Sequence, residues 1–328
     1  MVELLTMLTL VLGADPGKPI APSHEQVLET VERGLTFLEK EGVAWVTKNP
    51  LANCCSCHHV PMMLWSQHAA QQRGLKIDVA ARDTVKAFLF QEFLAGAEPV
   101  PKEGVGLDVV YLSLALAAKP LPEPAVAKTL DKFKSFLLDN QLPNGTWKIA
   151  KNPMSPTAKI PAPIEDTDDV VTSWALLAIT SGSNSRIDPR IVQQSQEKAL
   201  NWLRQATPND SNQSLVTRLL VEQRFGKAEE VQRHVKQLLS QQREDGGWSQ
   251  VKELPSDALA TGQALYALAA VGNVDARDAV ERARAFLVPT QSKDGSWLVK
   301  TRIANHKDKI ITFDGTGWAI LGLIQHIK

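Results

Sequence analysis

A threonine-anchored pattern recurs in three places along the chain and limits what the chain can fold into. Thr172-Ser-Trp-Ala-Leu, Thr261-Gly-Gln-Ala-Leu and Thr316-Gly-Trp-Ala-Ile each run into further turns of small and aliphatic residues. Such internal similarity is typical of repeat architectures, in which each unit buries its apolar face on its neighbours. The chain is therefore predicted to stack copies of one structural unit.

Each unit contains two helices, because apolar residues recur with helical spacing in two successive segments. The first helix of a pair is amphipathic and charged, whereas the second is small, apolar and nearly uncharged. Glycines end several of these helices, Gly74 and Gly226 among them. The six predicted pairs are 25–41 with 60–73, 79–94 with 107–118, 125–140 with 170–180, 190–205 with 213–225, 229–242 with 259–271, and 276–289 with 314–327.

The alternation of the two helix types predicts how the pairs are arranged. A helix that is apolar all round must be buried, and a helix with one polar face can cover it. An inner ring of six apolar helices covered by an outer ring of six amphipathic helices satisfies both of these requirements. We expect an all-α fold, a closed α/α toroid formed by a single domain over residues 23–328.

The links between the helices carry a second repeated motif. It occurs as Gln141-Leu-Pro-Asn-Gly-Thr-Trp147, Gln242-Arg-Glu-Asp-Gly-Gly-Trp248 and Gln291-Ser-Lys-Asp-Gly-Ser-Trp297. Asn-Gly and Asp-Gly favour tight turns, and the Trp can then lie back over the end of the preceding helix. We interpret the motif as a structural clasp.

These motifs resemble the QW repeats of the squalene-hopene cyclase and prenyltransferase β-subunit superfamily. The resemblance covers all six helix pairs, with three well-formed motifs in the second half of the chain. It implies the toroid fold, but a fold hosts many activities. Two insertions, 148–164 and 298–311, interrupt the pattern before inner helices and are expected to overhang one end of the barrel.

An acidic segment, Asp166-Thr-Asp168-Asp169, precedes one apolar helix. It resembles the D-x-D-D motif of class II terpenoid cyclases, and the resemblance implies that Asp168 protonates the substrate while Asp166 and Asp169 tune it. Clustered carboxyl groups in a poorly solvated site cannot all ionise, so one retains a proton.

The repeats offer a simpler interpretation of the same residues. An aspartate stands four residues before the anchoring threonine in two repeats, as Asp168 and Asp257, and Asp108 holds the equivalent place in another. An aspartate at this place is typical of a helix N-cap. Squalene-hopene cyclases also differ from this chain, since they form their cavity between helical domains and line it with aromatic residues, which make up only 6% of this chain.

All three cysteines lie in Cys54-Cys-Ser-Cys57-His58-His59. Cys54-x-x-Cys57-His58 fits the attachment motif for haem c, in which two thiols bond the haem and the histidine binds iron. Candidates for the sixth ligand are Met62, Met63, His68 and His306, whereas His59 adjoins the motif. Zinc bound by Cys54, Cys57 and a histidine is a second interpretation, and a disulfide or free thiols a third.

The two motifs are expected to share one end of the barrel. Inner helices in an alternating barrel run parallel, so every residue that precedes one lies on the same rim. Counting back from the terminating Gly74 and Gly272 places His59 level with Asp257. The other histidines, His24, His234 and His326, are expected at the surface.

Charge and terminal sequence bear on location and partners. Lys plus Arg equals Asp plus Glu at 36 each, which argues against nucleic acid as a partner, and no membrane span is evident. Residues 1–22 fit a signal peptide and leader, and export to the periplasm would suit haem c. The hypotheses are a cyclase-like protein with a haem or metal centre, an apolar or isoprenoid ligand and a redox partner; a class II cyclase acting through Asp168; and a non-catalytic binding scaffold.

Overall fold

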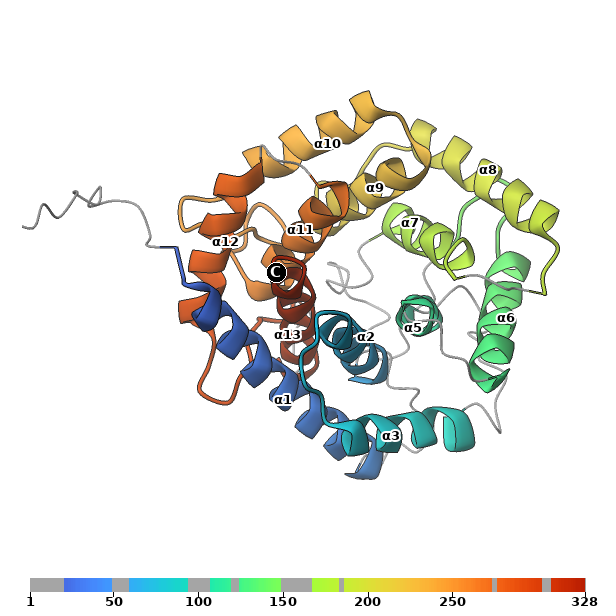
Figure 1. The fold of residues 1–328 in the computed structure, drawn as a ribbon. Coiled ribbons are helices and arrows are strands. Elements are labelled where there is room, and N and C mark those ends of the chain that lie inside the picture. The colour runs from blue at the N-terminus through green and yellow to red at the C-terminus, as the bar shows by residue number, and fades with distance from the viewer. Residues whose placement is uncertain are drawn as a thin grey trace, which may run out of the picture.

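The computed structural model describes residues 21–48, 59–93, 107–118, 124–148, 167–182, 186–272, 276–302 and 308–327. Its helices form two concentric rings (Figure 1). The outer ring consists of α1 (His24–Lys48), α3 (Val79–Ala87) with the π-helical turn η1 (Phe88–Phe93), α6 (Pro124–Asp139), α8 (Pro189–Gln205), α10 (Ala228–Ser240) and α12 (Arg277–Thr290). The inner ring consists of α2 (His59–Gln72), α5 (Leu107–Ala117), α7 (Asp168–Ile179), α9 (Asn212–Phe225), α11 (Ala258–Val271) and α13 (Lys309–Ile324).

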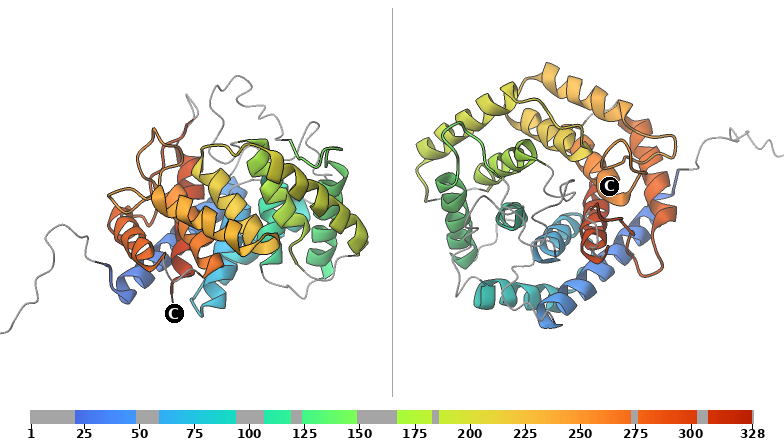
Figure 2. Two further views of the ribbon diagram at one scale, coloured as in Figure 1. Left: turned by 90° about the horizontal axis from the view of Figure 1, so that it is seen from above. Right: turned by 180° about the vertical axis from the view of Figure 1, so that it is seen from behind.

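The predicted all-α toroid is confirmed. The inner helices contact one another in the closed order α2, α5, α7, α9, α11, α13 and back to α2. The same two rings are visible from behind, and the side view shows the outer helices lying against the inner ones (Figure 2). Within the described ranges the sole β-type pairing is an isolated bridge between Trp248 and Asp257.

The inner helices run parallel, as the packing of α2 on α13 illustrates. The rings of His59 and Phe313 lie 4.1 Å apart near the start of both helices, and those of Trp65 and Trp318 lie 5.5 Å apart further along. At the far end the Arg73 guanidinium donates a 2.8 Å hydrogen bond to the Ile327 carbonyl. We call the end where the inner helices begin the amino rim and the opposite end the carboxyl rim.

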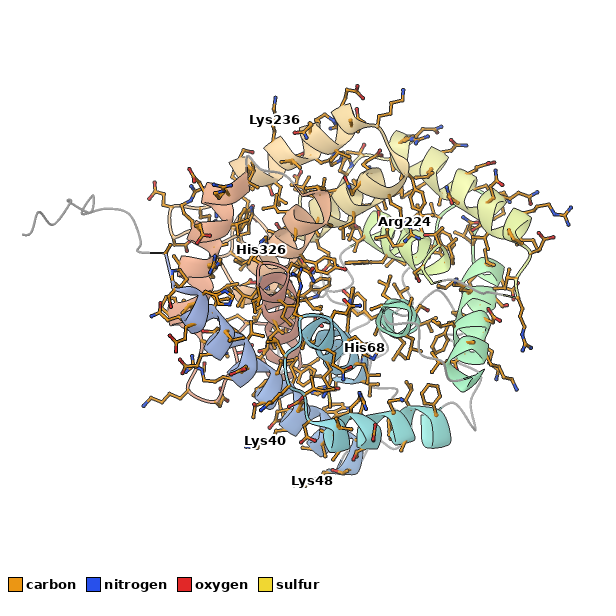
Figure 3. The ribbon with its side chains drawn as sticks, viewed as in Figure 1. Lys40, Lys48, His68, Arg224, Lys236 and His326 are labelled. Atoms are coloured by element: carbon orange, nitrogen blue, oxygen red, sulfur yellow. The ribbon has the colours of Figure 1, made fainter. Side chains whose placement is uncertain are left out.

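Burial follows the two helix types predicted from composition. In α13 every residue from Ile311 to Ile324 is buried, whereas α10 buries only one face. Charged side chains such as Lys40 and Lys236 lie on the outer ring (Figure 3). Small residues let inner helices approach closely: a Cβ on Gly262 would lie 2.3 Å from the Trp318 carbonyl carbon. The apolar stretches are therefore core because both of their faces are covered.

The clasps join neighbouring outer helices. In each clasp the indole N–H bonds the carbonyl of the preceding outer helix, at Leu137, Leu238 and Leu287. The glutamine amide bonds the carbonyl of the next outer helix, at Ser195, Ala279 and Thr30 respectively. Because the last of these bonds joins Gln291 to Thr30, it closes the outer ring across almost the whole sequence.

Three helices differ from the prediction, in extent or in type: the last inner helix, α13, begins at Lys309 rather than at Asp314. The first outer helix continues to Lys48 rather than ending at Glu41, and its added turns carry Trp45, which stacks on His59 with ring centroids 4.0 Å apart. The second outer helix ends as the π-helical turn η1. Propensity cannot show either feature, because the extension depends on a contact with another helix.

No helix in the described part of the chain is long and apolar enough to span a membrane. Residues 1–20 lie outside the described residues, so the leader and the division of the chain at residue 23 stay predictions.

Candidate functional site

Five aromatic side chains meet in the middle of the inner ring, and we call them the aromatic cluster. They are Trp65 on α2, Tyr111 on α5, Trp174 on α7, Tyr266 on α11 and Trp318 on α13. Trp318 is the hub, with ring centroids 5.5 to 6.3 Å from the other four. The cluster includes both tyrosines of the chain and three of its eight tryptophans.

The cluster extends across the axis of the barrel. Helices α7 and α13 are three places apart in a closed ring of six and so lie opposite each other. The rings of Trp174 and Trp318 are nevertheless only 5.7 Å apart. The described side chains therefore close the lumen at this level, and the ligand cavity expected from the sequence stays a prediction.

The anchoring threonines explain why these residues face the axis. Thr172 and Thr316 accept hydrogen bonds from the backbone N–H groups of Trp147 and Trp297, both 3.1 Å, so these threonines face the outer ring. A residue two places later lies about 200° further around a helix. Trp174 and Trp318 consequently point inward.

Two glutamines on the adjacent inner helices α9 and α11 pair with each other in the inner ring. Gln263 stands two residues after Thr261, which bonds the Trp248 N–H at 3.0 Å, and it therefore also faces the axis. Its amide donates to Gln213 of α9 at 2.7 Å, and both side chains are buried. Inner-ring residues thus form one level of aromatic rings and paired amides.

The acidic segment divides into residues with different surroundings. Asp168 is the first residue of α7 and is exposed. Asp169 is buried and accepts hydrogen bonds from Ser214, at 2.5 Å, and from Thr167, and it pairs with Arg218 at 3.5 Å. Because a guanidinium and two hydroxyl groups stabilise its charge, Asp169 ties α7 to α9. Asp166 lies outside the described residues.

The interpretation of Asp168 as an N-cap is wrong. Thr167 takes the N-cap position of α7, one residue earlier than the repeat predicts. Asp257 does cap its helix, accepting from the Ala260 N–H at 2.9 Å and from the Gln250 amide at 2.7 Å. Burial raises the pKa of the Asp257 carboxyl group to about 6, against these hydrogen bonds, which lower it. The repeat therefore aligns the threonines, but α7 begins a residue earlier.

The cysteine motif is mostly beyond the described residues: Cys54, Cys57 and His58 cannot be placed, and neither can His306. His59 is the first residue of α2, so it shares the amino rim with Asp168 as expected. Its ring lies between Trp45 and Phe313, at 4.0 and 4.1 Å, and is 1% exposed. The His59 ring thus packs α2 against α1 and α13.

The other proposed iron ligands are core residues. Met62 and Met63 are fully buried, and Met62 fills the space beside Gly317 of α13. His68 lies about 13 Å further along α2 than His59, and its Nδ1 is 2.9 Å from the Ala115 carbonyl oxygen. Among the described residues no three His, Cys, Asp or Glu side chains form a group suited to a metal ion. Haem c and zinc stay predictions.

The expected surface position holds for His24 but not for the other two histidines. His24 is exposed, whereas His234 is buried at 5% exposure and bonds the Glu230 carbonyl at 2.8 Å. His326 is partly buried, with its Nε2 3.4 Å from the Leu265 carbonyl. Burial lowers the pKa of both. Both histidines have charged neighbours in the sequence, and these neighbours suggested a surface position although the histidines themselves face inward.

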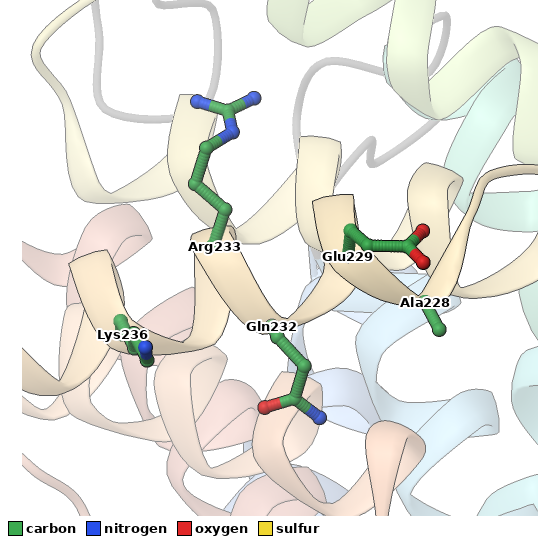
Figure 4. A pocket seen from close by; sticks show the side chains of 5 residues that line it. All are labelled: Ala228, Glu229, Gln232, Arg233 and Lys236. Carbon is green, nitrogen blue, oxygen red and sulfur yellow. The ribbon is translucent and has the colours of Figure 1, made fainter.

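A hollow on the outer ring differs from the lumen. Its lining on α10 consists of Ala228, Glu229, Gln232, Arg233 and Lys236 (Figure 4). Since charges of both signs line this open surface, it does not suit an apolar ligand.

Sequence reasoning missed the aromatic cluster and one further residue, Asp314. The signal was present: in two of the three anchored motifs a tryptophan stands two places after the threonine. Asp314 lies in α13, four residues before Trp318, and is 0% exposed. It attracts no attention in the sequence because no other acid surrounds it.

Comparison with known proteins shows what the fold is similar to. The family profile of the squalene-hopene cyclase N-terminal domain matches residues 191–301. No curated protein matches the chain. A variant of the type II terpene cyclase MstE from Scytonema, in complex with geranylgeranyl dihydroxybenzoate as substrate, aligns with TM-score 0.62 and 13% identity, covering 94% of this chain and 99% of that one.

A second solved structure has a different description. A possible member of the GH105 family from Klebsiella pneumoniae subsp. pneumoniae MGH 78578 aligns with TM-score 0.61 and 13% identity over 99% of both chains. At such identities the likeness shows the fold alone. The MstE chain is matched over 99% of its length by this one barrel.

Proposed function

We propose that this protein is a class II terpenoid cyclase that takes a polyprenoid chain in through the amino rim and cyclises it over the aromatic cluster. The observation that carries the proposal is the cluster itself. Both tyrosines and three tryptophans converge where opposite inner helices meet. The negative face of an aromatic ring stabilises a positive charge, and a carbocation is the intermediate that a cyclase must stabilise.

The surroundings of the cluster would exclude water from that intermediate. Val170 and Leu259 stand four residues before Trp174 and Gln263, one turn nearer the amino rim on the same faces, and both are buried. Met62 of α2 is also buried, where it packs beside Gly317 of α13. Apolar side chains offer no nucleophile that could capture the carbocation, so the substrate can rearrange before it loses a proton.

Two buried donors in the cluster support a ligand that carries an oxygen. The indole N–H groups of Trp174 and Trp318 have no hydrogen-bond acceptor within the described part of the chain. Buried donors are normally satisfied, so each such group asks for an explanation. A hydroxyl or carbonyl oxygen of a terpenoid would satisfy one of them.

Product analysis tests the proposal. The full chain is incubated with farnesol and with geranylgeraniol, and extracts are examined by gas chromatography with mass spectrometry. We expect cyclic isomers of unchanged mass. Trp174→Leu keeps the apolar character of the site but removes one ring face, and should lower turnover by tenfold or more; the control Trp202→Leu, on outer helix α8, should leave it unchanged.

A wild-type protein that neither converts nor binds these polyprenols would contradict the proposal. Binding is followed by quenching of tryptophan fluorescence, which the cluster makes sensitive to a ligand in the lumen. Equal loss of turnover in the two leucine variants would show that the effect is on stability and not on the cation.

A further inference from the structure

Three buried polar atoms at the level of the aromatic cluster have no hydrogen-bond partner within the described ranges. They are the indole nitrogens of Trp174 and Trp318 and the amide oxygen Oε1 of Gln263. The three side chains are 1%, 0% and 0% exposed. Since buried polar groups are normally bonded, two donors and one acceptor left open in the same place call for an explanation.

The three side chains lie close together across the barrel axis. Each stands two residues after an anchoring threonine, and the rings of Trp174 and Trp318 are 5.7 Å apart. Gly262, the neighbour of Gln263, packs on the backbone of Trp318, where a Cβ would lie 2.3 Å from the carbonyl carbon. The ring of Tyr266, one turn further along α11, is 5.7 Å from that of Trp318. Gln263 and Trp318 therefore share one level on adjacent helices.

The tryptophans of the clasps show what the fold does with an indole that has only a structural role. Trp147, Trp248 and Trp297 are as deeply buried as the two in the lumen. Each of them nevertheless donates its N–H to a leucine carbonyl group, at 2.6 to 2.8 Å. The open N–H groups in the lumen are thus not a general property of buried tryptophans in this protein.

The open atoms also do not satisfy one another. The Gln263 amide donates to Gln213 at 2.7 Å, which leaves its oxygen as an acceptor, and neither indole N–H reaches that oxygen. A hydroxyl group has one proton to donate and two lone pairs that accept. It can therefore bond both indoles and the amide oxygen at once, whereas a carbonyl or ether oxygen can only accept.

We propose that the lumen binds the hydroxyl group of a polyprenoid alcohol, an inference that rests on the proposed cyclase function. Trp174 and Trp318 donate to the hydroxyl oxygen, and the Gln263 amide oxygen accepts its proton in a hydrogen bond. The hydrocarbon chain lies against Val170 and Leu259, which are buried one turn nearer the amino rim. A few polar groups in an otherwise apolar site fix the orientation of a ligand. The substrate class is therefore an alcohol and not a hydrocarbon.

Three saturated probes test the hydroxyl subsite by binding alone: hexahydrofarnesol, its methyl ether and farnesane. They share a branched chain and contain no alkene that could be protonated, so equilibrium dialysis with gas chromatography measures binding without turnover. We expect the wild type to bind hexahydrofarnesol at least about tenfold more tightly than the other two, because an analogue that lacks the hydroxyl leaves the polar atoms of the site unpaired.

Variants that each remove one polar atom assign the subsite. Trp174→Phe and Trp318→Phe keep an aromatic face and lose the N–H, and Gln263→Met loses the acceptor at similar length. Each should lose most of the preference for hexahydrofarnesol and keep the wild-type affinity for farnesane, which also shows that the variant is folded. Two controls should keep the preference: Trp202→Phe on α8, and Gln213→Met, which breaks the same amide pair but leaves the Gln263 oxygen in place.

The outcomes separate the subsite from the cyclase function. If the wild type converts farnesol but binds the three probes equally, the polar atoms hold only water, and the subsite is wrong while the function survives. A preference that persists in the Phe and Met variants would also overturn the subsite. If hexahydrofarnesol is preferred but farnesol is not converted, the subsite is supported and the cyclase function fails. If no probe binds and farnesol is not converted, both fail.

Discussion

The backbone N–H and carbonyl groups at the helix ends find their hydrogen-bond partners in different ways at the two rims of the inner ring. At the carboxyl rim, side chains of neighbouring inner helices bond the terminal carbonyl groups: Arg73 bonds the Gln325 and Ile327 carbonyls, Gln72 that of Ala118, and Arg224 that of Thr180. At the amino rim the caps are local, from Asp257 and Ser211 to their own helices, and buried acids accumulate nearby.

The difference teaches where function can reside. Bonds between neighbouring helices at the carboxyl rim lock the ring and leave few polar groups for a ligand. The amino rim contains the buried acids Asp169 and Asp314 and the partly buried Asp257, although burying a charge is costly unless it is compensated. Such groups persist where they hold the structure together, as Asp169 does through Arg218 and Ser214.

Two arginines on one helix offer the most direct way to break this comparison, and the largest expected effect. Arg218 lies midway along α9 but pairs with Asp169 of the amino rim, and its side chain is 11% exposed, whereas Arg224 is exposed near the carboxyl end. Arg218→Leu leaves Asp169 as a buried charge and should cost about 3 to 5 kcal/mol of unfolding free energy. Arg224→Leu should cost about 1 kcal/mol or less.

Urea unfolding measures both variants. Adding Asp169→Asn to Arg218→Leu should recover a large part of the loss, because the uncompensated charge disappears. Equal costs for the two arginines would remove the distinction between the rims.

A comparable loss is expected from a clasp. Trp248 is 1% exposed and donates to the Leu238 carbonyl at 2.8 Å, so Trp248→Ala should cost about 3 to 5 kcal/mol. Gly246 has φ +87 and a Cβ there would lie 2.4 Å from the Arg282 carbonyl oxygen, so Gly246→Val should be at least as harmful. Differential scanning calorimetry checks both, and a Trp248→Ala cost below about 1 kcal/mol would show that the clasp does not support the rim.

The Asp257 carboxyl group predicts a pH dependence of smaller size. Its pKa is about 6 in the folded protein and 3.8 in the unfolded chain, so the folded state binds more protons between these values. Stability should therefore fall as pH rises from 4 to 6, by about 3 kcal/mol at most.

Asp257→Asn removes the titrating group and keeps a capping side chain. The difference in unfolding free energy between wild type and this variant, measured by urea titration at pH 4 and pH 7, should favour the wild type more at the lower pH. A difference that does not change with pH would mean that the carboxyl group titrates normally.

The smallest effect is expected at Asp168. Asp168 is exposed in the first turn of α7, where its charge interacts with the positive end of the helix, so Asp168→Ala should cost about 0.3 to 1 kcal/mol and less at high salt. Chemical unfolding at low and high ionic strength measures this. A cost of several kcal/mol, independent of salt, would give Asp168 a structural partner and return it to the group of buried rim acids.

The local periodicity of the sequence was sufficient to predict most of the helices and their division into two rings. The spacing of apolar residues identified both helices of every pair, and their composition separated inner from outer, since a helix without a polar face can only be buried. The Gln-to-Trp spacing identified the clasps because all but one of their bonds follow from local turn geometry and the next outer helix along the chain. Asp257 was recognised as a cap for the same reason.

Tertiary structure decided which inward faces meet. Helical spacing shows that Trp174 and Trp318 each lie opposite a threonine, but only closure of the ring brings these residues from opposite helices within 5.7 Å. The same closure covers His59 with Trp45 and Phe313, pairs Asp169 with Arg218, and turns Asp314 from an unremarked acid into a buried group beside aromatic rings. Each of these depends on contacts between residues far apart in the chain, and a periodic pattern contains no information about its partner.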